Sequence, residues 1–181
     1  QSLRTALPPV FFGAGGPAMR QAGVEILWDL TGAATIGLFD GLRRFHTYSR
    51  AFRDLFHQAR LRQPDLVIGI DYGAFNLRFA AAVRRHLDKR RDWFHPWRPI
   101  LIQYVSPQVW ASRPGRARLM ERTLDLLVSI LPFEPEWFAR HAPRLPVRFV
   151  GHPLVDRWTS QRPNRLPVSS DTPPRLVLLP G

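Results

Sequence analysis

The chain has 181 residues, of which 45% are hydrophobic and 22% are charged. This composition can bury a core, and the length fits one large domain or one and a half small ones. The absence of cysteine excludes disulfides, thiolate catalysis and cysteine-ligated metals. The net charge is +12, but the basic residues are almost all arginines spread along the chain. Such a charge favours acidic partners such as phosphates or an anionic membrane surface, whereas a nucleic-acid footprint would be concentrated on one face.

Two short strands with a glycine-rich turn are predicted at the beginning of the chain. Residues 10–12 read as a strand, 13–17 as the turn, 18–22 as a short helix and 23–28 as a second strand. Backbone N–H groups at Gly15 and Gly16 would let a phosphate or a sugar approach closely. A simple tight turn also accounts for these glycines.

Residues 38–59 are predicted to form an amphipathic, basic helix. Its apolar residues recur at spacings of three and four, or their sum, and arginines fill other positions. The spaced apolar residues are Leu38, Leu42, Phe45, Phe52, Leu55, Phe56 and Ala59. The pattern is typical of a surface helix packed on a sheet; the alternative is a helix that lies on a membrane surface.

An apolar run at 66–70 ends abruptly at Asp71, before a glycine turn and an amphipathic helix at 76–87. In an open α/β sheet, ligands bind outside the carboxyl ends of the strands. Asp71 is therefore the leading candidate for a functional carboxylate. The alternative is a carboxylate that only caps the following turn or helix.

Strands and helices are expected to alternate through the rest of the chain. We expect a basic, aromatic loop at 88–98, strands at 99–105, 124–131 and 147–150, helices ending near 123 and 142, a linker at 159–174 and a last strand from 175. Strands separated by helices at roughly 25-residue intervals indicate an α/β fold with a doubly wound parallel sheet. No stretch reaches the ~18 consecutive apolar residues that a membrane-spanning helix needs.

Several of these segments carry motifs in a collinear order. They are found at 12–19, 36–38, 64–71, 75–77, 104–111, 131–134, 149–154 and 178–181, and include Val-Ser-Pro-Gln-Val-Trp at 105–110 and Gly-His-Pro at 151–153. Together they resemble the lipid-A-disaccharide synthases, which are inverting glycosyltransferases, over nearly the whole chain. The resemblance implies a Rossmann-like sheet that forms the N-terminal half of a GT-B enzyme.

The resemblance also implies a domain organisation and a reaction. Residues 1–158 would form the acceptor-side domain without its first strand, 159–174 a linker, and 175–181 the first strand of a nucleotide-sugar domain. The enzyme would transfer 2,3-diacylglucosamine from UDP-2,3-diacylglucosamine to 2,3-diacylglucosamine 1-phosphate, releasing UDP, in lipid A biosynthesis. We expect no cofactor and no metal, and no activity from this part alone. We expect a cytoplasmic protein held peripherally at the inner face of the cytoplasmic membrane, without nucleic acid or an obligate protein partner.

Roles for single residues follow from the same resemblance. Asp71 would be the general base. The substrate-binding candidates are Gly15, Gly16, Asn76, Ser106, Gln108, Arg113, Arg116 and His152, each of which also has a plain structural explanation. Ala74 and Ser112 depart from the family pattern, which commonly has an acid and a tryptophan there. Asp71 is thus the sole carboxylate in its loop.

Acylated substrates require a surface that meets the bilayer. The candidates for membrane or acyl contact are Phe39, Leu42, Phe45 and Tyr48, followed by Trp93, Phe94 and Trp97. Two other function classes stay open: another GT-B sugar-nucleotide enzyme, and a non-enzymatic basic domain that binds membrane or nucleic acid.

Overall fold

The computed structural model describes residues 8–30, 41–90 and 96–160, with the side chains in these ranges except those of 41–45 and 157–160. The strands are β1 (Phe12–Gly15), β2 (Glu25–Asp29), β3 (Leu66–Ile70), β4 (Ile100–Tyr104), β5 (Leu126–Ser129) and β6 (Val147–Phe149). The helices are α1 (Pro17–Gln21), α2 (Gly41–Arg62), α3 (Gly73–Lys89), α4 (Val109–Ser112), α5 (Arg116–Thr123), α6 (Glu134–His141) and α7 (Pro153–Ser160).

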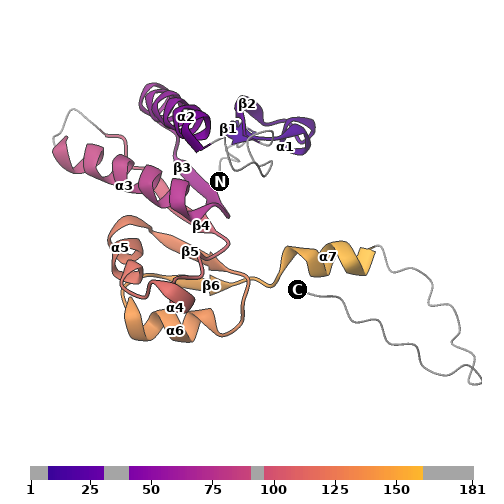
Figure 1. The fold of residues 1–181 in the computed structure, drawn as a ribbon, viewed down its shortest axis with the longest axis vertical. Helices are drawn as coiled ribbons and strands as arrows, with labels where there is room; N and C mark the ends of the chain where they lie inside the picture. The colour runs from indigo at the N-terminus through magenta and orange to yellow at the C-terminus, as the bar shows by residue number, and fades with distance from the viewer. Residues whose placement is uncertain (1–7, 31–40, 91–95, 161–181) are drawn as a thin grey trace, which may run out of the picture.

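Every strand pairing in this part of the chain is parallel, which confirms the predicted α/β class. Strands β3, β4, β5 and β6 form a four-stranded sheet in sequential order, and β1 pairs with β2 in a separate sheet (Figure 1). Because neighbouring strands are parallel, the chain must return from the end of each strand to the edge of the sheet where the next strand begins. The connecting helices perform this return, so all four strands end at one edge of the sheet.

Helices α3, α5 and α6 cover one face of the four-stranded sheet. Their buried side chains include Val83, Met120 and Phe138, which are fully buried and pack with Leu101 and Leu127 of the sheet. The opposite face carries side chains exposed by 42–53%: Leu66, Ile68, Ile70 and Ile100. Within the described residues, the helices therefore cover one face only.

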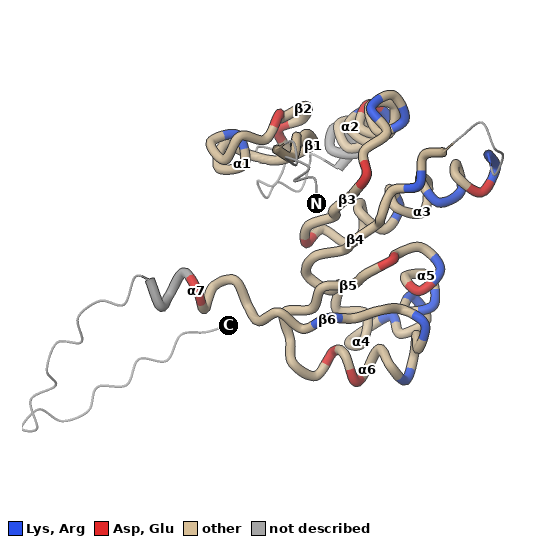
Figure 2. The backbone as a smooth tube through the Cα atoms, turned by 180° about the vertical axis from the view of Figure 1, so that it is seen from behind, with Lys and Arg blue, Asp and Glu red and all other residues tan. Residues whose placement is uncertain are grey.

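Helix α2 packs on α3 and also contacts β1. Ala51, Leu55 and Ala59 are buried along its inner face. Phe52 and Phe56 stack edge-on against Phe79 of α3 at centroid distances of 5.5 and 6.2 Å. The predicted amphipathic surface helix is thus present, and basic residues recur along both α2 and α3 (Figure 2).

Arg62, the last residue of α2, joins the two sheets. Its guanidinium donates two hydrogen bonds, of 2.5 and 2.9 Å, to the carboxylate of Glu25 at the start of β2. The same group lies 4.7 Å from the ring centre of Phe12 at the start of β1. The beginnings of β1 and β2 therefore lie close to the end of α2.

Some predicted boundaries were wrong. Strand β1 includes Gly13 and Gly15, which were predicted to lie in a turn; at Gly15 the reason is that α1 packs closely on the strand. A β-carbon at Gly15 would lie 2.4 Å from the sulfur of Met19. Helices α4 and α7 were not predicted, and α7 runs to Ser160, two residues past the expected domain end. The expected last strand and most of the expected linker lie outside the described residues.

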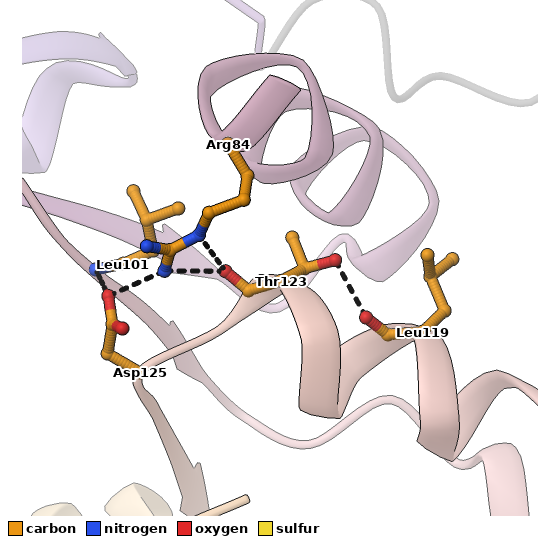
Figure 3. Close-up of polar contacts among 5 residues, drawn as sticks. All are labelled: Arg84, Leu101, Leu119, Thr123 and Asp125. Carbon is orange, nitrogen blue, oxygen red and sulfur yellow. Dashed lines mark hydrogen bonds and ion pairs between the residues drawn. The ribbon is translucent and has the colours of Figure 1, made fainter. Parts of the chain in front are cut away.

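The amino edge of the sheet is held by a polar cluster around Arg84 of α3 (Figure 3). Its guanidinium donates to the carbonyl of Thr123 and, at 2.8 Å, to the carboxylate of Asp125. The same carboxylate oxygen accepts a 2.8 Å hydrogen bond from the N–H of Leu101. These contacts connect α3, the end of α5 and the beginnings of β4 and β5.

In the part of the chain described here, no helix is long and apolar enough to cross a membrane.

Candidate active site

The carboxyl edge of the four-stranded sheet gathers most of the predicted site residues. Asp71 follows β3, Ser106 and Gln108 follow β4, and His152 follows β6. Helices α3, α5 and α6 all begin at this edge. Their N-terminal ends carry partial positive charge, which favours a bound anion.

Asp71 lies in a left-handed backbone conformation, with φ of 56°, directly after β3. Its N–H donates a 2.9 Å hydrogen bond to the carbonyl of Tyr104, so its backbone is still tied to β4. The side chain is exposed, and no described residue donates a hydrogen bond to its carboxylate. The first turn of α3 has Tyr72 as N-cap and no side-chain cap, so the helix-capping role is not observed. The carboxylate is available to an external partner.

Gln103 holds the backbone of this edge, a role that the sequence analysis missed. Its side chain is 1% exposed, and its amide nitrogen lies 2.9, 3.2 and 3.1 Å from the carbonyls of Asp71, Tyr104 and Val105. Val105 has a φ of 66°, which is unfavourable for a β-branched residue. Two adjacent strands therefore end in left-handed residues whose carbonyls share one buried amide. Only its position on the inward-facing side of β4 could have indicated this.

Two glycines permit the close approach of these loops. A β-carbon at Gly69 would lie 2.7 Å from the side-chain oxygen of Gln103, and one at Gly73 would lie 2.6 Å from the ring of Pro107. Real side chains essentially never show such distances. The turn after β3 is thus pressed against the loop after β4, and this contact fixes the position of Asp71.

The three residues predicted to bind the acceptor sugar differ in accessibility. Asn76 is half-buried, and its amide donates a 3.1 Å hydrogen bond to the carbonyl of Ile70, so it supports the strand end. Ser106 is only 5% exposed, and its hydroxyl lies 3.4 Å from the carbonyl of Pro107. Gln108 is exposed at the start of α4. Of the three, Gln108 is the side chain most open to a ligand.

The predicted cationic residues lie farther along the same edge. Arg113 and Arg116 are exposed at the start of α5, and no described residue forms an ion pair with either. His152 is half-buried after β6, and its Nδ1 accepts a 3.2 Å hydrogen bond from the N–H of Leu154. Since β3 and β6 are three strand spacings apart, His152 lies roughly 14 Å from Asp71 along the edge. The structure therefore does not place these two side chains together.

Tyr48 of α2 lies beside the turn that carries Asp71. Its ring centre is 5.6 Å from that of Tyr72 and 6.2 Å from that of Phe75, and the residue is half-buried rather than fully exposed as expected. Phe39 lies outside the described residues, as do the side chains of Leu42 and Phe45. Trp97 is 8% exposed and belongs to the core, so its predicted membrane contact is wrong. Trp93 and Phe94 also lie outside the described part.

Gly15 and Gly16 belong to the other sheet, at the end of β1 and the beginning of α1. Gly15 is explained by its contact with Met19, which favours its structural role over a ligand-binding one. Gly16 is the N-cap of α1 without a side-chain cap.

Glu134 is a buried carboxylate close to the carboxyl edge. It is fully buried and accepts hydrogen bonds from the indole of Trp110, at 3.1 Å, and from the hydroxyl of Ser129, at 2.5 Å. Its two oxygens are thus used to join α4, α6 and β5. Glu134 therefore anchors Trp110 at the edge and is not available for catalysis.

Among the described residues, no three His, Asp or Glu side chains are grouped so as to hold a metal ion.

The sequence is similar to those of proteins of one family. The family model described as lipid-A-disaccharide synthetase matches residues 2–180. A lipid-A-disaccharide synthase of Geobacter sulfurreducens is 42% identical over 157 residues, which is 87% of this chain and 38% of that protein. One of Rhodopseudomonas palustris is 40% identical over 94% of this chain and 41% of its own length. One of Chromohalobacter salexigens is 35% identical over 100% of this chain and 45% of its own.

The chain therefore spans about four tenths of the length of the curated relatives that it matches. The match covers all the described strands, including the four whose ends form the candidate site. By this match, the chain belongs to the lipid-A-disaccharide synthetase family.

Proposed function

We propose that this chain is the acceptor-side domain of an inverting glycosyltransferase. The enzyme would transfer 2,3-diacylglucosamine from UDP-2,3-diacylglucosamine to 2,3-diacylglucosamine 1-phosphate and release UDP. The observation that carries the proposal is the exposed carboxylate of Asp71 at a strand end, which has no partner among the described residues, in a chain of this family. The parallel α/β architecture agrees with one half of a GT-B enzyme. A second, nucleotide-binding half would supply the donor site.

In this proposal the Asp71 carboxylate removes the proton from the 6-hydroxyl of the acceptor. The acceptor oxygen then forms a bond to C1 of the donor sugar from the face opposite UDP, and the C1–O bond to the diphosphate breaks with inversion. General-base catalysis of this kind contributes typically ~10²–10⁴-fold. The rigid attachment of the Asp71 backbone to β4 and Gln103 supports this role, because positioning errors are costly in catalysis.

The neighbouring groups suggest how the acceptor lies. Gln108 is exposed and can hydrogen-bond the sugar, and Asn76 retains its side-chain oxygen as an acceptor. Arg113 and Arg116 are unpaired among the described residues and can bind the 1-phosphate with charge-assisted hydrogen bonds. Ser106 and His152 would contribute to shape at the edge, as would Gly16 if the two sheets share one cleft.

The acyl chains need an apolar path next to the base. Tyr48, Tyr72 and Phe75 form an aromatic cluster beside Asp71, and Tyr72 is 52% exposed. We propose that this cluster, with Phe39, Leu42 and Phe45 of the preceding segment, contacts the acyl chains at the anionic inner surface of the cytoplasmic membrane. The exposed arginines of α2 would interact with the lipid headgroups.

The test is an assay of the purified full-length protein with both substrates. Formation of the disaccharide 1-phosphate together with UDP is the expected result. Release of UDP only with a different acceptor would identify another glycosyltransferase. Salt-sensitive binding to duplex DNA without any transfer would favour the basic-domain alternative and contradict the proposal.

A further inference from the structure

A pocket of about 110 Å³ opens at the amino edge of the sheet, between the ends of α2 and α3 and the segment that enters β4. It is lined by His57, Arg60, Leu61, Gln63, His86, Leu87, Arg90, Trp97 and Arg98. Strands β3 and β4 separate this pocket from Asp71, and five residues of strand span about 17 Å. The pocket is therefore distinct from the candidate active site.

The lining is strongly cationic. Three arginines, Arg60, Arg90 and Arg98, face it, and no described lining residue is acidic. Helices α2 and α3 both end here, and each C-terminus contributes about −0.5 of a charge. These negative helix ends offset part of the positive charge of the arginines, and the lining remains cationic. A cationic lining suits a phosphate group, which carries about −1.5 to −2 near neutral pH.

The floor of the pocket is rigid. Trp97 is 8% exposed, and its indole N–H donates a 2.9 Å hydrogen bond to the carbonyl of Pro64. The ring of His86 lies 6.2 Å from that of Trp97 and meets Phe56 edge-on at 5.8 Å. The arginines therefore surround a floor that is held in place by these contacts.

We propose that this pocket binds a phosphate group, either as a free phosphomonoester or inorganic phosphate or as a lipid headgroup. Guanidinium groups donate paired hydrogen bonds that match phosphate oxygens, which lysines do not reproduce. The volume of about 110 Å³ is several times what one water molecule needs. The site is independent of Asp71, so it can exist whether or not Asp71 is the catalytic base.

The test compares two double variants of the full-length protein with the same change in charge. Arg60→Gln/Arg90→Gln removes two cations of the pocket, whereas Arg53→Gln/Arg85→Gln removes two from the same helices outside it. Binding of inorganic phosphate is measured by calorimetry and by the NMR signal of the Trp97 indole N–H. We expect saturable binding by the wild type and the control, and binding at least about tenfold weaker in the pocket variant.

The proposal is overturned if the wild type shows no saturable phosphate binding, or if both double variants lose affinity equally. Should the glutamine pair fail to fold, Arg60→Lys/Arg90→Lys retains the charge and removes the paired donors. Weaker phosphate binding by this variant supports the proposal, and unchanged binding contradicts it.

The source of the phosphate is identified with vesicles of phosphatidylcholine with or without phosphatidic acid, whose headgroup is a phosphomonoester. If a lipid headgroup fills the pocket, inorganic phosphate competes with the acidic vesicles and the pocket variant binds them more weakly than the control variant. If phosphate binds in the pocket but the vesicles do not compete, the ligand is a soluble phosphate. Either result supports the site and distinguishes its two sources.

Discussion

The two edges of the four-stranded sheet are made by the same strands but differ in how their polar groups are satisfied. At the amino edge, Arg84 and Asp125 pair with each other and with backbone groups. The left-handed residue there, Gln63, ends α2 with a hydrogen bond to Ala59, which is an ordinary way to end a helix. At the carboxyl edge, the Asp71 carboxylate has no partner among the described residues.

The carboxyl edge also contains the less favourable backbone. Asp71 and Val105 both have positive φ and follow adjacent strands, and such conformations cost about 1–3 kcal/mol each. The buried amide of Gln103 compensates by binding their carbonyls. The comparison indicates that the contacts at the amino edge stabilise the sheet. At the carboxyl edge, strained backbone lowers stability and places a carboxylate toward solvent.

The largest effect is expected for Asp71→Asn in the full-length enzyme. The amide keeps the size of the side chain but cannot accept the proton, so kcat should fall by ~10²–10⁴-fold. Asp65→Asn is the matched control, because Asp65 precedes the strand that Asp71 follows. A kcat of Asp71→Asn within about tenfold of wild type would be too high for the proposed general base.

Gln103→Leu should have the next largest effect. The leucine has a similar size but removes the buried donor of the Asp71 and Val105 carbonyls, whereas the Tyr104 carbonyl keeps the N–H of Asp71; the expected cost is about 1–3 kcal/mol of the free energy of unfolding. If Gln103 acts by positioning Asp71, Gln103→Leu alone should also lower kcat. The same substitution should leave kcat unchanged when it is added to Asp71→Asn. An equal loss of kcat in both backgrounds would show that the two residues act independently.

Gly73→Ala tests the contact between the two loops. Its methyl group would overlap Pro107, and overpacking of this kind costs about 1–3 kcal/mol. Gly115→Ala is the control, because a β-carbon there meets nothing within 4 Å and the backbone φ is −60°. Chemical denaturation should separate the two variants; equal midpoints would mean that the loops are not pressed together.

The sequence predicted the sheet well because hydrophobic runs and periodicity are local signals. The strand at Leu66–Ile70 and helices α3, α5 and α6 after it were predicted within a few residues, whereas α4 and α7 were not predicted. The carboxylate of Asp71 was also identified, since its place at a strand end depends only on local order. Gly15 of β1 was assigned wrongly to a turn, because its small size is required by the packing of Met19 from the next helix.

The rest of the site depends on contacts between distant segments, which no single sequence reveals. The role of Gln103 requires the turn after β3, 32 residues away, to lie beside β4. The burial of Ser106 and Trp97 likewise follows from packing between elements. The roles of Arg113, Arg116 and His152 stay predictions, because their positions at the edge are consistent with a ligand but do not require one.

At the amino edge, Arg84→Ala should destabilise the fold without changing catalysis. The substitution removes the hydrogen bonds to Thr123 and Asp125, and the expected loss is about 1–2 kcal/mol because both charged groups are partly exposed. Arg85→Ala, on the outer side of the same helix, should change stability little. A fall in kcat of fully folded Arg84→Ala would contradict the division between the two edges.

The smallest effect concerns the ion pair between Glu25 and Arg62, which joins the sheets. Hydrogen bonds from Arg62, followed by its charge, lower the pKa of the Glu25 carboxyl. A lowered pKa contributes stability above the ordinary pKa of glutamate, and this contribution is lost as the pH falls through the folded-state pKa. Glu25→Gln should therefore be slightly less stable than wild type at pH 7, with a difference that shrinks as the pH falls below about 4. A difference that does not depend on pH would contradict this assignment.

The most direct test of the central claim is amide hydrogen exchange of the full-length protein with and without the acceptor, 2,3-diacylglucosamine 1-phosphate. We expect the acceptor to slow exchange at the carboxyl edge, in segments 71–76 and 105–113. Segment 123–126 at the amino edge, which does not line the arginine pocket, should be unchanged. Protection confined to the amino edge, or none at 71–76, would contradict the placement of the active site at Asp71.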